Sequence, residues 1–147
     1  MIPPAKHDPP RMTFQCRVGT NVFAVREALL AMTRTAPLAD LHPDRRDLAE
    51  IVLAEVLNNV AEHAYAGGPG DITVTLSQVR DRLWCVVTDR GRVMPQGQLP
   101  PGTLPATAGV QLADLPEGGF GWHVIRSLTA DLNYTRDQDQ NRLSFLI

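Results

Sequence analysis

The segment from Pro43 to Ala64 most constrains how this chain can fold, because apolar residues recur through it at the spacing of a helix. Pro43-Asp44 suits a first helical turn, where proline loses no hydrogen bond. The run Gly67-Gly68-Pro69-Gly70 then ends the helix and turns the chain. The positions expected on the buried face of this helix are Leu48, Ile51, Val52, Val56, Leu57 and Val60.

Further helices and strands are predicted around this segment. One helix begins at Gly19-Thr20-Asn21 and ends before Pro37, and another runs from Gly121 to about Ala130. Alternating apolar residues predict strands over residues 12–18, 72–79, 83–88, 132–136 and 142–147. This order favours an α+β fold, a two-layer sandwich with the main helices on one face of a mostly antiparallel sheet.

Length and composition limit the class of protein. With 147 residues and a net charge of -2, the chain fits one domain and has no excess charge for nucleic acid or an anionic membrane surface. No apolar run approaches the roughly 20 residues of a membrane helix, and the first residues lack the apolar stretch of a signal peptide. We expect a flexible Pro-rich leader over residues 1–11 and a single domain over 12–147.

The cysteines indicate the redox compartment, and the single lysine limits which kind of nucleotide-binding protein this can be. Cys16 and Cys85 fall in predicted strands without Cys-x-x-Cys spacing, so we expect buried free thiols in a reducing cytoplasm. Lys6 is the one lysine among 14 basic residues, and it lies in the leader. P-loop proteins and eukaryotic-type kinases place a lysine on nucleotide phosphates. A nucleotide site in this chain therefore needs another architecture.

Polar residues follow one another along one face of the central helix. Glu55, Asn59 and His63 are each four residues apart, so their side chains project side by side. Glu55 could act as a general base, and Asn59 offers a neutral oxygen that suits Mg²⁺. A hydrogen-bonded polar patch is the structural alternative for this pair, and His63 is typical of a helix end.

Two glycine-bearing segments come after this helix. Asp89 ends an apolar strand, where its carboxylate can accept a hydrogen bond from an amine such as adenine N6, and Gly91 leaves room for a base. Alone, Asp-x-Gly is usually a turn. Gly118-Gly119-Phe120-Gly121 opens the last helix, whose first N–H groups can bind an anion. A flexible loop with a helix cap is the alternative there, and Phe120 and Trp122 are more typical of packing than of base stacking.

The stretch over residues 91–117 connects these two segments. It is rich in proline, glycine and small residues without sustained periodicity, and so long a loop in a compact domain is often a functional lid. Arg90, Arg92 and Arg126 lie near its ends and could reach a phosphate, although charged surface is the usual role of such residues.

The order of these segments resembles that of the Bergerat-fold ATPases, the superfamily of gyrase B, histidine kinases and heat-shock chaperones. Within it, Leu-Ala-Glu-Val-Leu-Asn-Asn-Val-Ala-Glu-His-Ala-Tyr at 53–65 closely resembles the N box of bacterial anti-sigma-factor serine kinases. Residues 119–125 and 131–134 resemble their second glycine box and the strand after it. The resemblance covers nearly the whole chain from about Met12.

This resemblance implies a serine/threonine protein kinase that uses ATP and Mg²⁺. Glu55 would be the catalytic base and Asn59 the magnesium ligand, and Asp89 with Gly91 would hold adenine. The other nucleotide-binding residues that it implies are His63, Gly119, Phe120, Gly121 and Trp122. One position departs from the family pattern Asp-x-Gly-x-Gly. Val93 stands where the second glycine is usual, and it adds bulk near the base.

The family also implies the partners. The kinase would phosphorylate a serine or threonine on a small anti-anti-sigma protein with a STAS domain, and would otherwise sequester a sigma factor or another output protein. No direct contact with nucleic acid or with a membrane is expected. The apolar first strand and first helix offer a surface for a homodimer.

Other functions stay open. One alternative is a partner-switching module that binds nucleotide without catalysis, or that has lost nucleotide binding, and it would explain Val93. A pure scaffold, however, has no need for Glu55, Asn59 and Asp89 together. A stand-alone histidine-kinase-like catalytic domain would need a phosphoacceptor histidine on a separate partner, because the residues before Met12 are too few for a dimerising helix. An ATP hydrolase such as a chaperone would normally require further domains.

Overall fold

The computed structural model describes residues 12–102 and 121–147 of the chain, so the predicted leader, most of the predicted lid, Gly119 and Phe120 lie outside the described residues. The helices are α1 (Val22–Thr33), α2 (Pro43–Asn59) and α3 (Gly121–Leu128), with a π-helical turn over Val60–Ala64 and 3₁₀ turns over Leu38–Asp40 and Pro95–Gly97. The strands are β1 (Thr13–Gly19), β2 (Asp71–Val79), β3 (Arg82–Asp89), β4 (Ala130–Asp137) and β5 (Gln140–Leu146). No helix within the described ranges is long and apolar enough to cross a membrane.

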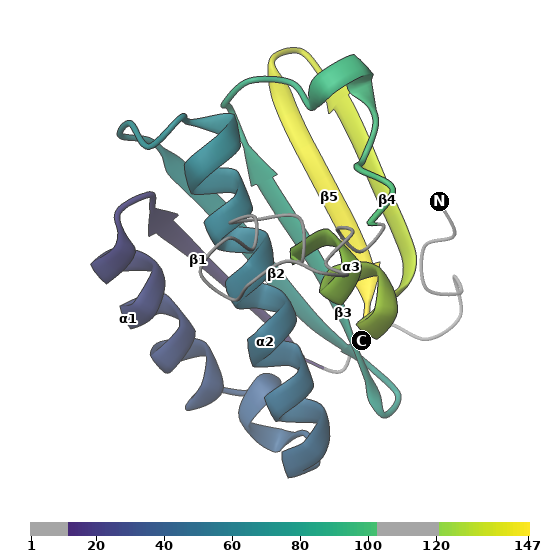
Figure 1. The fold of residues 1–147 in the computed structure, drawn as a ribbon. Coiled ribbons are helices and arrows are strands. Elements are labelled where there is room, and N and C mark those ends of the chain that lie inside the picture. The colour runs from purple at the N-terminus through teal and green to yellow at the C-terminus, as the bar shows by residue number, and fades with distance from the viewer. Residues whose placement is uncertain (1–11, 103–120) are drawn as a thin grey trace, which may run out of the picture.

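The strands form one sheet in the order β1-β2-β3-β5-β4, and every neighbouring pair is antiparallel. Figure 1 shows α1, α2 and α3 over one face of this sheet, with α2 in the middle. The predicted α+β two-layer sandwich is therefore confirmed. The predicted end of the last helix was two residues late, because β4 already begins at Ala130.

The sheet buries one of its faces. On β2, Ile72, Val74 and Leu76 are fully buried in the core, whereas Thr73 and Thr75 between them stay half-buried on the other face. Side chains alternate across a strand, so this period of two decides which face receives the helices. Each large apolar side chain buried in this way contributes about 1.5–3 kcal/mol.

Helix α2 fills the centre of the helical layer. Its buried residues are Ala49, Val52, Leu53, Val56 and Leu57. The predicted buried face was wrong at two positions, since Leu48 is 38% exposed and Ile51 is 48% exposed. The core takes the helical stripe that begins one residue further along, at Ala49, and leaves the neighbouring stripe in solvent.

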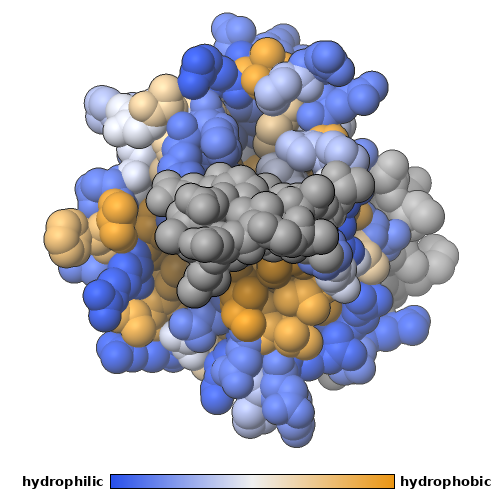
Figure 2. Space-filling view, in the orientation of Figure 1, coloured by the Kyte–Doolittle hydropathy of each residue, from blue (hydrophilic) through white to orange (hydrophobic). Residues whose placement is uncertain are grey.

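Helix α1 has a defined start and an apolar first turn in solvent. The Asn21 side chain accepts a hydrogen bond of 2.8 Å from the Ala24 N–H, a cap that typically contributes about 1 kcal/mol. Val25 is buried, but Val22 and Phe23 are 76% and 78% exposed. Figure 2 shows apolar surface over this end of α1. The first turn of α1 therefore carries apolar area that the core does not use.

Both cysteines are free thiols. Cys85 is buried in the central strand β3, as predicted, but Cys16 is only half-buried because β1 is an edge strand. Burial raises the pKa of both thiols above the ordinary value, since a thiolate is poorly solvated in the core.

Candidate functional site

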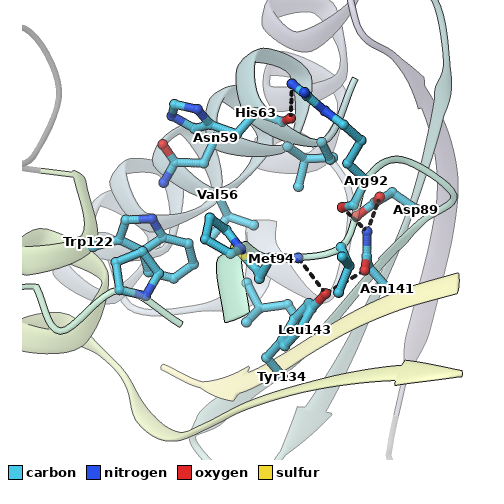
Figure 3. A pocket seen from close by; sticks show the side chains of 15 residues that line it. Val56, Asn59, His63, Asp89, Arg92, Met94, Trp122, Tyr134, Asn141 and Leu143 are labelled. Atoms are coloured by element: carbon cyan, nitrogen blue, oxygen red, sulfur yellow. Dashed lines mark hydrogen bonds between the residues drawn. The ribbon is translucent and has the colours of Figure 1, made fainter. Parts of the chain in front are cut away.

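A cavity of about 530 Å³ opens between the end of α2, the start of α3 and the β4–β5 hairpin. Figure 3 shows Asp89 and Asn141 on one side of it and Asn59 on the other. Apolar walls with a few polar groups are typical of a small-molecule site. Much of the wall is apolar and comes from residues such as Val56, Met94, Trp122 and Leu143.

Glu55 and Asn59 meet the start of α3 at one edge of this cavity. A Cβ placed on Gly121 would lie 2.7 Å from Glu55 Oε2 and 3.5 Å from Asn59 Nδ2. Only glycine therefore lets the first residue of α3 come this close to the Glu55 carboxylate as it stands, whereas the distance to Asn59 is an ordinary contact. The predicted base, the predicted metal ligand and the helix N-terminus predicted to bind an anion lie together.

Asn59 carries an amide that lacks a partner. Its Nδ2 is buried and makes no hydrogen bond within the part of the chain that the structure describes. A buried polar atom without a partner costs roughly 1–3 kcal/mol. The two ends of an amide have similar shapes, so a half-turn would bring Oδ1 to the same place. Asn59 can thus offer a donor or an acceptor to a ligand in the cavity.

A π-helical turn follows Asn59 and holds the loop after β3. The Tyr65 N–H bonds the Val60 carbonyl at 3.2 Å. Because the helix ends here, the carbonyl oxygens of His63 and Ala64 have no partner within it. Ala64 accepts from the Arg92 N–H at 2.7 Å, and His63 accepts from the Arg92 guanidinium at 3.2 Å. Such turns occur often at functional sites.

Gly91 is required by this contact between helix end and loop. A Cβ at position 91 would lie 2.5 Å from the Ala64 carbonyl oxygen and 2.6 Å from the Ala64 carbonyl carbon. Both are backbone atoms, which cannot move aside as a side chain can. The structure thus gives close approach to Ala64 as a reason for the glycine, besides the room for a base that the sequence predicts.

Asp89 ends β3 at the cavity and is only 6% exposed. Its Oδ1 accepts hydrogen bonds of 2.8 Å from the Gly91 N–H and from Asn141 Nδ2. Among the described residues no donor reaches Oδ2. The carboxylate is thus held by one oxygen and has the other available for a ligand.

The polar residues of the last hairpin were missed by the sequence reasoning. Asn141 bonds Asp89, Tyr134 and Arg136, and Figure 3 shows it beside Asp89 with Tyr134 below. A signal was present in the sequence. Asn141 alternates in phase with the buried residues Leu143 and Phe145, and an amide in such a row needs polar partners.

The structure brings most of the predicted site residues to one cavity. Asn59, His63, Asp89 and Trp122 line it, whereas Glu55 and Gly121 meet beside it. Gly119 and Phe120 lie outside the described residues.

Val93 and the nearby arginines have ordinary structural roles. Val93 lines the cavity, is 49% exposed and does not have a positive φ, so it does not need the backbone freedom of glycine. Arg92 bonds the His63 carbonyl as described, and Arg126 Nε donates to the Pro100 carbonyl at 2.9 Å.

Comparison with known proteins agrees with this geometry. The family model for the histidine kinase-like ATPase domain matches residues 20–147. The chain is 29% identical over 97 residues to the serine-protein kinase RsbW of Bacillus mycoides, which is 66% of this chain and 60% of that protein. A protein of the same name from Bacillus cereus is 29% identical over 89 residues, 60% of this chain and 56% of the relative.

The matched parts thus span less than two thirds of these relatives. The resemblance inferred from residues 53–65 is confirmed by these matches. By its sequence over 20–147 and by its two-layer fold, the chain belongs to the histidine kinase-like ATPase domain family.

Proposed function

We propose that this chain is an ATP-dependent serine/threonine protein kinase whose nucleotide binds in the cavity between α2, α3 and the sheet. One observation carries the proposal. Gly121 lies beside both Glu55 and Asn59. A Cβ on this glycine would lie 2.7 Å from the Glu55 carboxylate and 3.5 Å from Asn59 Nδ2. A base, a metal ligand and an anion-binding helix end are thereby gathered in one place. The family match and the relatives named serine-protein kinase support the same reading.

The cavity suits ATP with Mg²⁺. Its volume of about 530 Å³ falls within the roughly 300–1,000 Å³ of small-molecule sites. The unpartnered atom of Asn59 is Nδ2, and a half-turn of the amide would put Oδ1 in its place. Mg²⁺ accepts a neutral oxygen of this kind beside phosphates and water. Asn59 would hold the ion, which supplies positive charge against the phosphates. Gly121, with Gly119 before it, would leave the N-terminal N–H groups of α3 open to those phosphates.

The remaining residues position the base and the reacting hydroxyl. Asp89 Oδ2 would accept a hydrogen bond from the adenine amine, and Trp122, Phe120 and His63 would border the nucleotide. Glu55 would take the proton from a serine or threonine hydroxyl of the partner. The hydroxyl oxygen would bond the γ-phosphorus while the bond from that phosphorus to the β-phosphate oxygen breaks, which releases ADP. Transfer of this kind depends mainly on alignment and charge.

The partner is proposed from the resemblance to the anti-sigma-factor kinases. The substrate would be an anti-anti-sigma protein with a STAS domain, and a sigma factor or another output protein would bind the kinase in its other state. The exposed Val22 and Phe23 give α1 an apolar surface that a second copy of the chain would cover. The two free thiols support a reducing compartment, the cytoplasm.

Calorimetric titration with ADP and ATP, with and without Mg²⁺, tests the nucleotide site. We expect Mg²⁺-dependent binding that Asp89→Asn abolishes, whereas Asp81→Asn in the exposed β2–β3 turn leaves it intact. Absence of binding at millimolar nucleotide would overturn the proposal.

Transfer of phosphate to purified STAS-domain proteins from γ-labelled ATP tests the kinase activity. Glu55→Gln should keep ATP affinity within about threefold and lower transfer at least about 100-fold, because a general base typically contributes 10²–10⁴. Glu50→Gln on the exposed side of α2 is the control. Tight Mg-ATP binding without transfer to any such protein would favour the non-catalytic module instead.

A further inference from the structure

Asn141 has every polar atom of its side chain bonded, although it lies at the cavity wall and is 4% exposed. Its Nδ2 donates to Asp89 Oδ1 at 2.8 Å and to the Arg92 carbonyl at 2.9 Å. Its Oδ1 accepts from the Tyr134 hydroxyl and, at 2.9 Å, from the Arg136 guanidinium. An amide so fully bonded is rigid, unlike that of Asn59.

The chemistry of these partners permits one orientation of the amide. A guanidinium only donates hydrogen bonds, and a carboxylate only accepts them. A reversed Asn141 would turn its nitrogen towards Arg136 and its oxygen towards Asp89, so both contacts would be lost. The nitrogen of Asn141 is therefore fixed on Asp89.

This contact fixes where the unbonded carboxylate oxygen of Asp89 lies, since the two oxygens are equivalent and differ only in position. Oδ1 already accepts from Asn141 and from the Gly91 N–H, each at 2.8 Å. The carboxylate cannot rotate without giving up both bonds. Oδ2 is then held as an acceptor, which attracts an amine on the facing edge of a base and repels a carbonyl oxygen.

We propose that Asn141 is the positioning residue for base selection. By fixing the Asp89 carboxylate, it makes the cavity prefer a purine with a 6-amine to one with a 6-carbonyl. This inference rests on the proposed nucleotide site and names its selectivity.

The same side chain also fixes the loop that forms one wall of the cavity. The Arg92 carbonyl is held by Asn141, and the Tyr134 hydroxyl that bonds Asn141 accepts the Met94 N–H at 3.0 Å. Met94 lines the cavity. Removing Asn141 would therefore loosen both Asp89 and this wall. Removing the Tyr134 hydroxyl loosens the wall and takes one bond from Asn141, which Arg136, Arg92 and Asp89 still hold.

The test is a calorimetric comparison of Mg-ATP with Mg-inosine triphosphate, in which a carbonyl replaces the 6-amine. We expect the wild type to prefer ATP by about 10- to 100-fold, as for a hydrogen bond to a charged group. Asn141→Ala should bring this ratio to within about threefold of one. Tyr134→Phe should keep a clear preference, and Asn133→Ala, a half-buried asparagine on β4, should leave the ratio unchanged.

A second variant keeps the test sharp if Asn141→Ala does not fold. Asn141→Leu is similar in size and fills the same space, but it cannot donate to Asp89, so it should also lose the preference. Equal weakening of both nucleotides by these variants, with the ratio intact, would show a structural role only and overturn the inference. A wild type that binds both nucleotides equally would overturn it as well. A wild type that binds neither would instead overturn the proposed function, and this assignment with it.

Discussion

The Glu55 carboxylate lies against the backbone of Gly121, so closely that a Cβ on that glycine would stand 2.7 Å from Oε2. The contact joins the middle of α2 to the first residue of α3. Glu55 is a flexible side chain and can move away from an added methyl group, whereas the backbone of α3 has no need to move. A substitution at Gly121 should therefore affect catalysis without affecting stability.

Gly121→Ala should therefore lower activity without lowering stability. Alanine is the better helix former, by about 1 kcal/mol in a helix interior and less at the first residue, so the free energy of unfolding should stay constant or rise slightly. The displaced Glu55 should reduce phosphoryl transfer about 10- to 100-fold, because small shifts of a positioned group are costly. Urea unfolding and initial rates, with Ser127→Ala on the exposed side of α3 as control, check this. An unchanged rate would argue against Glu55 as the base.

Gly91→Ala should act in the opposite way and destabilise the fold. The new Cβ would meet the Ala64 carbonyl oxygen at 2.5 Å, and we expect a loss of about 3 kcal/mol because only backbone can yield. Gly67→Ala is the matched control. Gly67 has a φ of 75° and no atom within 4 Å of the added Cβ, so only the left-handed strain of about 1 kcal/mol remains. Equal losses in urea unfolding would show that the contact with Ala64 is not limiting.

Val93→Gly should change ATP affinity by less than about threefold. Val93 is 49% exposed and does not have a positive φ, so the backbone there does not require glycine. Glycine should lower the free energy of unfolding by about 0.5–1 kcal/mol through its greater freedom in the unfolded chain. Val93→Ala removes the bulk without adding that freedom. If both variants bound ATP more than tenfold tighter in calorimetry, the valine side chain would be obstructing the base.

Cys85 should make the protein less stable at alkaline pH. Burial raises the pKa of this thiol far above its ordinary value, so the folded state keeps the proton while the unfolded chain releases it above about pH 8.5. Stability is thus complete below that pH and falls as the pH rises, by up to roughly 1.4 kcal/mol per unit. Urea unfolding at pH 7.5 and 9.5 should show a larger drop for wild type than for Cys85→Val. Equal drops would assign the alkaline loss to other groups.

The fold was predictable because its signals are local. The alternation of Ile72, Val74 and Leu76 is visible within one strand, and so is the glycine run that ends the central helix. The exposure of Leu48 and Ile51 was not predictable from spacing, since two adjacent stripes of α2 are apolar and only the packed structure selects one.

The candidate site also has residues that local sequence predicts and residues that it does not. Glu55 and Asn59 are one helical turn apart, so their common face follows from the sequence. Asn141 reaches Asp89 across strand pairing between distant segments, and a hydrogen bond of this kind leaves little local pattern. The contact between Gly91 and Ala64 was not predicted, because Ala64 meets Gly91 only after the helix ends in a π turn.

That turn has a consequence for how the chain can vary in length. A helix advances about 100° per residue, so one residue added or lost between Asn59 and Tyr65 would rotate the carbonyl oxygens of His63 and Ala64 away from Arg92. The glycine run that follows bonds Ala61, Tyr65 and Thr20 and not the loop that carries Gly91, so length changes there should disturb the site far less. Natural insertions and deletions in this family are therefore expected in the run over 67–70 and not in the turn before it, whose length ties Asn59 to the loop that carries Gly91.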